Sequence, residues 1–135
     1  MKKILTSGLI AGFVLSVMGY GSLYLAIRFL PSLFADYNNP LFNSDGSRDI
    51  LFYMHAFILS IALSWFWERF KSMFKGGFII RGFEFGFVYA MVSLIPVMWI
   101  TFSALDVTIT MVLSWLLYGL IQAIIAGIVF AKMNP

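Results

Sequence analysis

The sequence predicts an all-α integral membrane protein, with four transmembrane helices in an up-down-up-down bundle. Of its 135 residues, 61% are hydrophobic and only 11% are charged, whereas soluble domains are about 45–50% apolar and about 25% charged. Four apolar runs are each long enough for an α-helix to cross about 30 Å of hydrocarbon. The basic residues lie at the ends of these runs. The chain has room for one membrane domain, residues 1–135, and for no separate soluble module.

The first apolar run predicts a helix over about residues 4–30. Lysines directly after the first methionine are typical of a signal peptide. The run is longer than the roughly 7–15 apolar residues of a cleaved signal, however, and no convincing cleavage site follows it. We therefore expect a transmembrane helix, which Pro31 ends or kinks near its outer end.

Residues 35–49 are the only extended polar segment, and they predict an outer loop. An Asn-Asn-Pro and an Asp-Gly sequence are turn signals. The three carboxylates of this loop could bind a cation, or the loop could act as a lid, but their spacing matches no known metal loop. We expect a solvated connector instead. The three carboxylates belong to Asp36, Asp45 and Asp49.

Three further apolar runs predict helices over about residues 50–70, 78–101 and 105–131. The connector between the first two of these is the short basic loop 71–77, and residues 102–104 separate the last two. Helices joined by such short connectors must be antiparallel neighbours. Pro96 is expected to kink the third helix of the chain, because proline removes a backbone hydrogen bond.

The basic residues predict how the bundle lies in the membrane. Seven of the nine lie on one side of the predicted bundle, and only Arg28 and Arg48 lie on the other. Lys and Arg beside membrane-spanning runs stay in the cytoplasm. Both termini and loop 71–77 are therefore expected to be cytoplasmic, and the protein is expected in a membrane, with the bacterial cytoplasmic (inner) membrane as its location. The seven are Lys2, Lys3, Arg69, Lys71, Lys75, Arg81 and Lys132.

Small residues spaced four apart predict where helices approach closely. Lipid tails are as apolar as leucine, so membrane helices associate through the close contact that small side chains permit. These faces could pack inside the bundle, or against another subunit or another copy of the chain. The predicted helix-packing residues are Gly8, Gly12, Gly82, Gly86, Gly119, Ala123 and Gly127.

The spacing of these residues also indicates a parallel two-plus-two internal repeat. Four small residues of the first helix coincide, at one fixed offset, with four of the third, and both helices run from inside to outside. Some transporters are built from such repeats. The other interpretation is that small-xxx-small patterns are simply common in transmembrane helices. The aligned pairs are Gly8 with Gly82, Gly12 with Gly86, Ser16 with Ala90, and Gly19 with Ser93.

Four polar residues within the apolar runs are candidates for a functional role: His55, Arg81, Glu84 and Gln122. A lone membrane histidine could ligate haem or relay protons, but a hydrogen bond between helices is the more common role for His55 and Gln122. Glu84 lies about 9 Å inside its helix, where an unpaired carboxylate is costly. It is either a functional acid or the partner of Arg81, which is three residues earlier and within reach.

Two classes of function follow from these observations. The first is a non-enzymatic accessory, scaffold or assembly subunit, whose helix faces of small residues bind a partner membrane protein or a second copy of the chain. The alternative is a small transporter or channel with a polar path near Glu84, Gln122 and His55. An enzyme is not expected, because the sequence holds no nucleophile–base pair, no paired carboxylates and no cluster of metal ligands.

Composition limits the partners and cofactors in the same way. The chain has no cysteine, which excludes thiol chemistry and Cys-ligated metals, and no motif specifies a cofactor. The net charge of +3 does not indicate nucleic-acid binding, because the basic residues lie at membrane boundaries and form no continuous stripe. The partner that the sequence does predict is the lipid bilayer.

Overall fold

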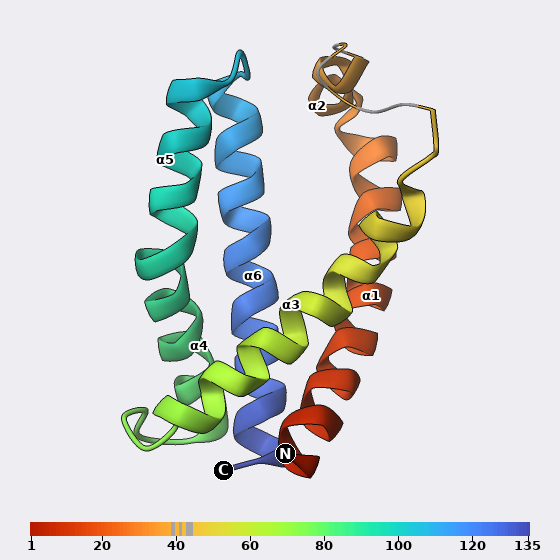
Figure 1. Cartoon of the computed structure of the whole chain (residues 1–135). Coiled ribbons are helices and arrows are strands. Elements are labelled where there is room, and N and C mark those ends of the chain that lie inside the picture. Colours follow the sequence, from red (N-terminus) through yellow and green to blue (C-terminus); the bar gives the residue numbers. More distant parts are fainter. Residues whose placement is uncertain (39, 41, 43–44) are drawn as a thin grey trace.

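The computed structural model describes residues 1–38, 40, 42 and 45–135, and within these residues it contains helices and no strand (Figure 1). Four helical segments of the described chain are long and apolar enough to cross a membrane, as predicted. Consecutive segments run in opposite directions, and both termini lie at the same end of the bundle (Figure 1). The four segments are α1 (Lys2–Phe29), α3 (Asp49–Phe70), the continuous α4–η2–α5 (Phe78–Ala104) and α6 (Ile109–Met133).

The segment after α1 contains more helix than the sequence predicts. Pro31 begins a short helix, α2 (Pro31–Ala35), which is followed by a 3₁₀ turn, η1 (Asp36–Asn38). Proline suits a first helical position, since its φ angle is already helical and its missing N–H is not needed there. Pro31 thus starts a new helix directly after α1 ends. Of the predicted loop 35–49, residues 39, 41, 43 and 44 lie outside the described residues.

The third membrane-length segment is interrupted near its middle by a π-helical turn. Helix α4 (Phe78–Tyr89) leads into this turn, η2 (Ala90–Leu94), and α5 (Ile95–Ala104) continues from it. Pro96 lies just beyond η2. Its ring cannot approach the carbonyl group of the residue four positions earlier, and it has no N–H to donate. The irregularity expected at Pro96 therefore takes the form of a wider helical turn.

Helix α6 begins at Ile109, four residues later than the predicted boundary at 105. Leu105 has extended backbone angles (φ −118°, ψ 147°), so it ends the preceding helix and cannot begin the next. Thr108 is the N-cap, and its Oγ1 accepts a hydrogen bond from the backbone N–H of Met111 at 3.3 Å. Threonine is a favoured capping residue because its hydroxyl satisfies an N–H that the first helical turn leaves free.

The two most extensive helix contacts join α1 to α3 and α4 to α6. On α1, a Cβ added to Gly8 would lie 3.1 Å from Cα of Ile61, and one added to Gly12 would lie 3.1 Å from Cα of Phe57. On α4, a Cβ added to Gly82 would lie only 2.6 Å from the backbone nitrogen of Ile128. Backbones can approach this closely only where a side chain is absent.

The remaining predicted packing residues lie in the contacts that α6 makes with α4 and η2. A Cβ added to Gly86 would lie 2.9 Å from the backbone nitrogen of Ile124, and one added to Gly127 would lie 2.9 Å from the carbonyl oxygen of Gly82. A Cβ added to Gly119 would lie 3.0 Å from Cδ2 of Leu94. Ala123 is fully buried. The helix faces that carry the small residues are thus packed against other helices of the bundle.

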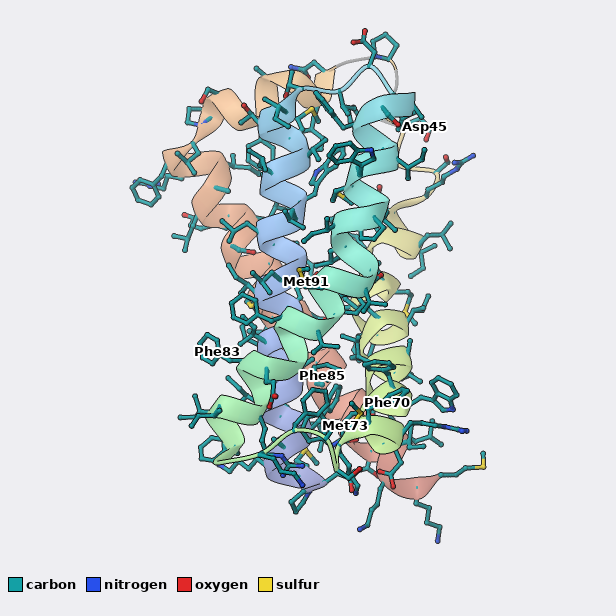
Figure 2. The ribbon with its side chains drawn as sticks, turned by 90° about the vertical axis from the view of Figure 1, so that its left-hand side faces the viewer. Asp45, Phe70, Met73, Phe83, Phe85 and Met91 are labelled. Carbon is teal, nitrogen blue, oxygen red and sulfur yellow. The ribbon has the colours of Figure 1, made fainter. Side chains whose placement is uncertain are left out.

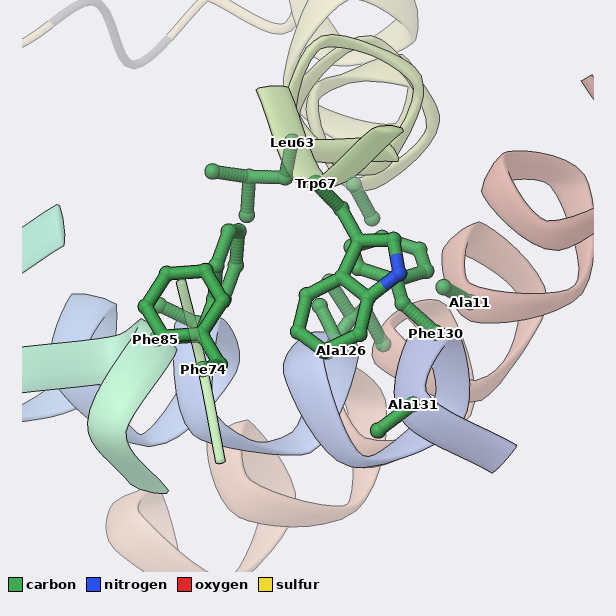
Figure 3. Close-up of a cluster of buried hydrophobic side chains, with 11 residues drawn as sticks. Ala11, Leu63, Trp67, Phe74, Phe85, Ala126, Phe130 and Ala131 are labelled. Carbon is green, nitrogen blue, oxygen red and sulfur yellow. The ribbon is translucent and has the colours of Figure 1, made fainter. Parts of the chain in front are cut away.

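A cluster of buried hydrophobic side chains, four of them aromatic, forms the core (Figure 3). Trp67 is fully buried and stacks almost parallel on Phe74, with their ring centroids 5.5 Å apart. Phe85 and Phe130 meet its ring at steeper angles, at 5.5 and 6.3 Å. The guanidinium carbon of Arg81 lies 4.9 Å above the same indole. This cluster joins α3, α4 and α6 with the loop that follows α3.

Hydrogen bonds from α3 hold the end of α6 beside this core. Trp67 Nε1 donates to the backbone oxygen of Asn134 at 2.9 Å, and Lys71 Nζ donates to Asn134 Oδ1 at 2.9 Å. The amide of Asn134 donates in turn to Glu68, whose carboxylate lies 3.5 Å from Lys71. The polar groups of two helix ends are satisfied by one another in this way.

Large apolar side chains also cover the outside of the bundle. Phe83 projects away from α4 and is 46% exposed, whereas Phe85, on the opposite face, points into the core and is fully buried (Figure 2). Met91 and Trp99 are 65% and 78% exposed. A surface that is as apolar as the interior suits hydrocarbon rather than water, so the four helices are those expected of a membrane protein.

Candidate polar cavity between α1, α3 and α6

A cavity of about 90 Å³ lies between α1, α3 and α6. Its walls combine apolar side chains, such as Leu15 and Ala56, with six polar side chains from the three helices. Its lining contains no acidic residue, and a histidine is its only basic residue. Such mixed walls with a few converging polar groups are typical of small-molecule sites. The polar lining residues are Ser16, Tyr20, Tyr53, His55, Tyr118 and Gln122.

The cavity lies beyond the closest contact between the backbones of α1 and α3. A Cβ at Gly12 would touch both Phe57 and Ser60 of α3. Two turns further along α1, a Cβ at Gly19 would meet only the hydroxyl of Tyr118, on α6, and one at Gly21 would meet nothing within 4 Å. The row of small residues on α1 therefore packs against α3 at its start and lines a cavity at its end.

Gln122 is the most deeply placed polar group of the cavity. It lies halfway along α6 and is only 3% exposed. Its amide hydrogen-bonds to none of the described residues, although it carries two donors and an acceptor oxygen. The amide is not fully enclosed, however: the buried side-chain atoms of the described residues that lack a partner are Ser16 Oγ and Arg81 Nε. The bond between helices that the sequence predicts for Gln122 is thus not made within the described bundle.

Ser16 of α1 is a second polar residue of the cavity that makes no hydrogen bond within the described residues. It lies halfway along α1, and its hydroxyl is buried and has no hydrogen-bond partner among the described residues. A helical serine can bond to a carbonyl of the preceding turn, and other serines in this bundle do so. Ser16 does not, so its hydroxyl is available to the cavity. The serines that bond to a preceding carbonyl include Ser7, Ser22, Ser60 and Ser114.

Aromatic rings form the open side of the cavity. Tyr20 of α1 and Tyr53 of α3 stack with their centroids 5.4 Å apart and their planes 5° apart, and they are 58% and 44% exposed. Phe52 packs against the edge of Tyr53 and is 68% exposed. His55 is also exposed, and it hydrogen-bonds to no described residue. His55 and Gln122, two of the three residues of the hypothetical polar path, thus line the same cavity.

Glu84 and Arg81 lie outside this site. Glu84 is exposed on α4 and pairs with none of the described residues. Arg81 does not reach toward it: Nη2 of Arg81 donates to the backbone oxygen of Lys71 at 3.1 Å, and its guanidinium lies over Trp67. The ion pair expected between Glu84 and Arg81 is therefore absent, and Glu84 takes no part in the polar cavity.

Two residues of the cavity, Ser16 and Tyr118, have no sequence signal for a polar role. Ser16 falls in the row of small residues on α1, where its spacing is that of a packing residue, and Tyr118 lies one helical turn before Gln122. No metal site accompanies them: within the described residues, no three His, Cys, Asp or Glu side chains are grouped so that they could hold a metal ion. The chemistry available here is hydrogen bonding by side chains of which none is a carboxylate, lysine or arginine.

Comparison with other proteins adds no assignment, because no protein-family model, no curated protein and no solved structure matches this chain. Its function is therefore inferred from the cavity and from the helix contacts around it.

Proposed function

We propose that the protein is a small, non-enzymatic membrane carrier that binds an uncharged molecule in the cavity between α1, α3 and α6. The observation that supports this proposal is that two polar groups facing the cavity make no hydrogen bond within the described residues: the Ser16 hydroxyl, which is fully buried, and the amide of Gln122, a residue that is 3% exposed. Each stands halfway along a membrane-length helix. A bound molecule that hydrogen-bonds to both would give the Gln122 amide a partner and would remove the cost of roughly 1–3 kcal/mol of the buried Ser16 hydroxyl.

The helix contacts support a carrier built from two equivalent hairpins. Gly8 and Gly12 of α1 face Ile61 and Phe57, and Gly82 and Gly86 of α4 face Ile128 and Ile124, so both hairpins pack with the same four-residue steps. His55 lies two residues before Phe57, and Gln122 lies two residues before Ile124. We propose that these halves form the parallel repeat. Repeat-based transporters bind their substrates near the midplane, at the interface between the repeats.

Removal of the unpartnered polar groups is expected to stabilise the protein in the absence of ligand. Ser16→Ala should raise the free energy of unfolding by roughly 1–3 kcal/mol, because a buried hydroxyl is no longer left without a partner. Gln122→Leu should raise it by less, because the Gln122 amide faces the cavity and is not fully enclosed. Groups retained for binding commonly lower stability in this way. The measurement is unfolding of the purified, ligand-free protein in mixed detergent micelles, followed by circular dichroism.

Ser7→Ala is the matched control for this experiment. The Ser7 hydroxyl is 2.7 Å from that of Ser64 in a buried contact between α1 and α3, so its loss should lower stability. If Ser16→Ala and Gln122→Leu lower stability as Ser7→Ala does, these groups hold the bundle together and the carrier proposal fails.

An accessory role is the second candidate, and Glu84 favours it. An exposed carboxylate on a membrane-length helix, with no partner among the described residues, suits a cationic residue of a neighbouring protein. The small helix faces do not support this role, because they are occupied inside the bundle. Loss of a stoichiometric co-purifying protein in Glu84→Gln, with the fold intact, would favour the accessory role over the carrier.

We also propose that both termini face the cytoplasm of a bacterial inner membrane. The termini and the α3–α4 connection lie at one end of the bundle (Figure 1), and most basic residues are in these segments. Single cysteines at Asn38 and Ser72, both exposed, test the orientation, since the chain has no cysteine of its own. Only Asn38→Cys should react with an impermeant maleimide on intact cells. Labelling of both positions would mean that the protein inserts in two orientations.

A further inference from the structure

We infer that the ligand of the cavity is an amphiphile with a small uncharged head group, such as a monoacylglycerol, which enters sideways from the bilayer. This inference rests on the carrier function proposed above and adds the chemical class of the ligand and its route. It follows from three properties of the site: the direction in which its polarity changes, the absence of a permanent charge and the small volume.

Polarity changes along the cavity from its closed end to its open end. The closed end holds the Ser16 hydroxyl, which is buried, and the Gln122 amide, on a residue that is 3% exposed. The open end is made of the aromatic rings of Tyr20, Phe52 and Tyr53, which are 58%, 68% and 44% exposed. These rings belong to membrane-length helices, with Phe52 and Tyr53 close to the start of α3 at Asp49, and we infer that the open side faces the bilayer near its surface. A molecule with a polar head inside and an apolar body at the opening matches this order.

The head group must be uncharged. The lining offers no carboxylate, lysine or arginine, and its one histidine, His55, is exposed, unlike Ser16 and Gln122 at the closed end. A charge in the middle of the bilayer without a partner is costly. The head must also both donate and accept hydrogen bonds, because the Gln122 amide has both kinds of group and the Ser16 and Tyr118 hydroxyls can serve as either. Hydroxyl-bearing heads meet these conditions, whereas the charged heads of phospholipids and of ionised fatty acids do not.

The volume limits how much of the ligand can be enclosed. A cavity of about 150 Å³ accommodates a benzene molecule, and this one measures about 90 Å³. Only a head of a few non-hydrogen atoms fits, so the rest of a membrane-dissolved ligand must leave through the open side. The stacked rings of Tyr20 and Tyr53 provide an apolar surface for an acyl chain at that opening.

Thermal unfolding with defined lipids tests the inference on the full-length protein in mild detergent. Monoolein should raise the unfolding midpoint of the native protein in a saturable manner. Methyl oleate, which lacks hydroxyl groups, ionised oleate, which is charged, and glycerol, which lacks the chain, should each shift it much less. The monoolein affinity should fall at least tenfold in Gln122→Leu, which keeps the fold, and in Gly19→Leu, which fills the cavity. Ser114→Ala, whose hydroxyl bonds within α6 at 2.7 Å, is the control and should bind like the native protein.

Each other outcome would overturn the inference in a distinct way. Equal effects of monoolein and methyl oleate would show that hydrogen bonding is not needed, and a larger effect of glycerol would identify a water-soluble ligand. Unchanged monoolein binding in both Gln122→Leu and Gly19→Leu would place the lipid on the outer surface. If Ser16→Ala and Gln122→Leu stabilise the ligand-free protein but monoolein does not bind, the ligand class is wrong while the carrier proposal stands.

Discussion

Gly82→Ala is expected to lower the free energy of unfolding by about 1–3 kcal/mol, although it adds a single methyl group. The new Cβ would lie 2.6 Å from the backbone nitrogen of Ile128 and 2.9 Å from its Cα. A backbone cannot rotate away as a flexible side chain can, so α4 and α6 would have to separate. Gly12→Ala should cost less, because its closest backbone contact, to Cα of Phe57, is 3.1 Å. Unfolding in mixed detergent micelles measures both.

Gly21→Ala is the control for these substitutions. Gly21 lies in α1, and a Cβ added there would have nothing within 4 Å, so the extra methyl group meets no neighbour. Alanine is also the better helix former by roughly 1 kcal/mol, so this change should leave stability unaltered or raise it. If Gly82→Ala and Gly21→Ala behaved alike, the close contact between α4 and α6 would not contribute to the stability of the bundle.

Trp67→Ala is expected to have the largest effect of any single truncation, about 3–5 kcal/mol. The indole is fully buried, stacks on Phe74 and donates a hydrogen bond to the backbone of Asn134 at 2.9 Å. Trp67→Phe should lose less stability, because it keeps an aromatic ring in the core while the donor is removed. The same unfolding measurement applies to both variants.

Trp99→Ala separates the effect of the core from the effect of removing any tryptophan. Trp99 is 78% exposed on α5, so its loss should change stability by no more than about 0.5 kcal/mol. A loss in Trp99→Ala as large as that in Trp67→Ala would mean that α5 packs against a surface outside this chain.

The four membrane-length helices could be predicted from the sequence because the bilayer constrains them so strongly. Backbone groups in hydrocarbon must bond within their own helix, so a long apolar run has few alternatives. For α3, the predicted range of residues 50–70 agrees with the observed helix, Asp49–Phe70. The ends of the helices and the connections between them depend on local turn chemistry, and they are harder to predict. Neither the N-cap at Thr108 nor the short helix that begins at Pro31 was expected.

The cavity could be predicted only in part, because residue counting gives the depth of a side chain but not the neighbour that it faces. Counting could not show that Glu84 lies on the outside of α4 while Gln122 lines a cavity together with residues of α1 and α3. Ser16 shares its spacing with Gly8 and Gly12, yet these glycines pack closely against α3 whereas Ser16 lines the cavity. Which of the two occurs depends on how both helices pack, and not on the spacing along one of them.

The pairing of neighbouring helices has a consequence for how the protein is assembled during synthesis. The closest contacts, α1 with α3 and α4 with α6, each join segments that are consecutive in the membrane. Contacts between neighbours along the chain form quickly and need no later segment. The first hairpin can therefore pack while the second is still being translated. The cavity has α6 as one of its walls, so it is completed only when this last helix has packed against the first hairpin.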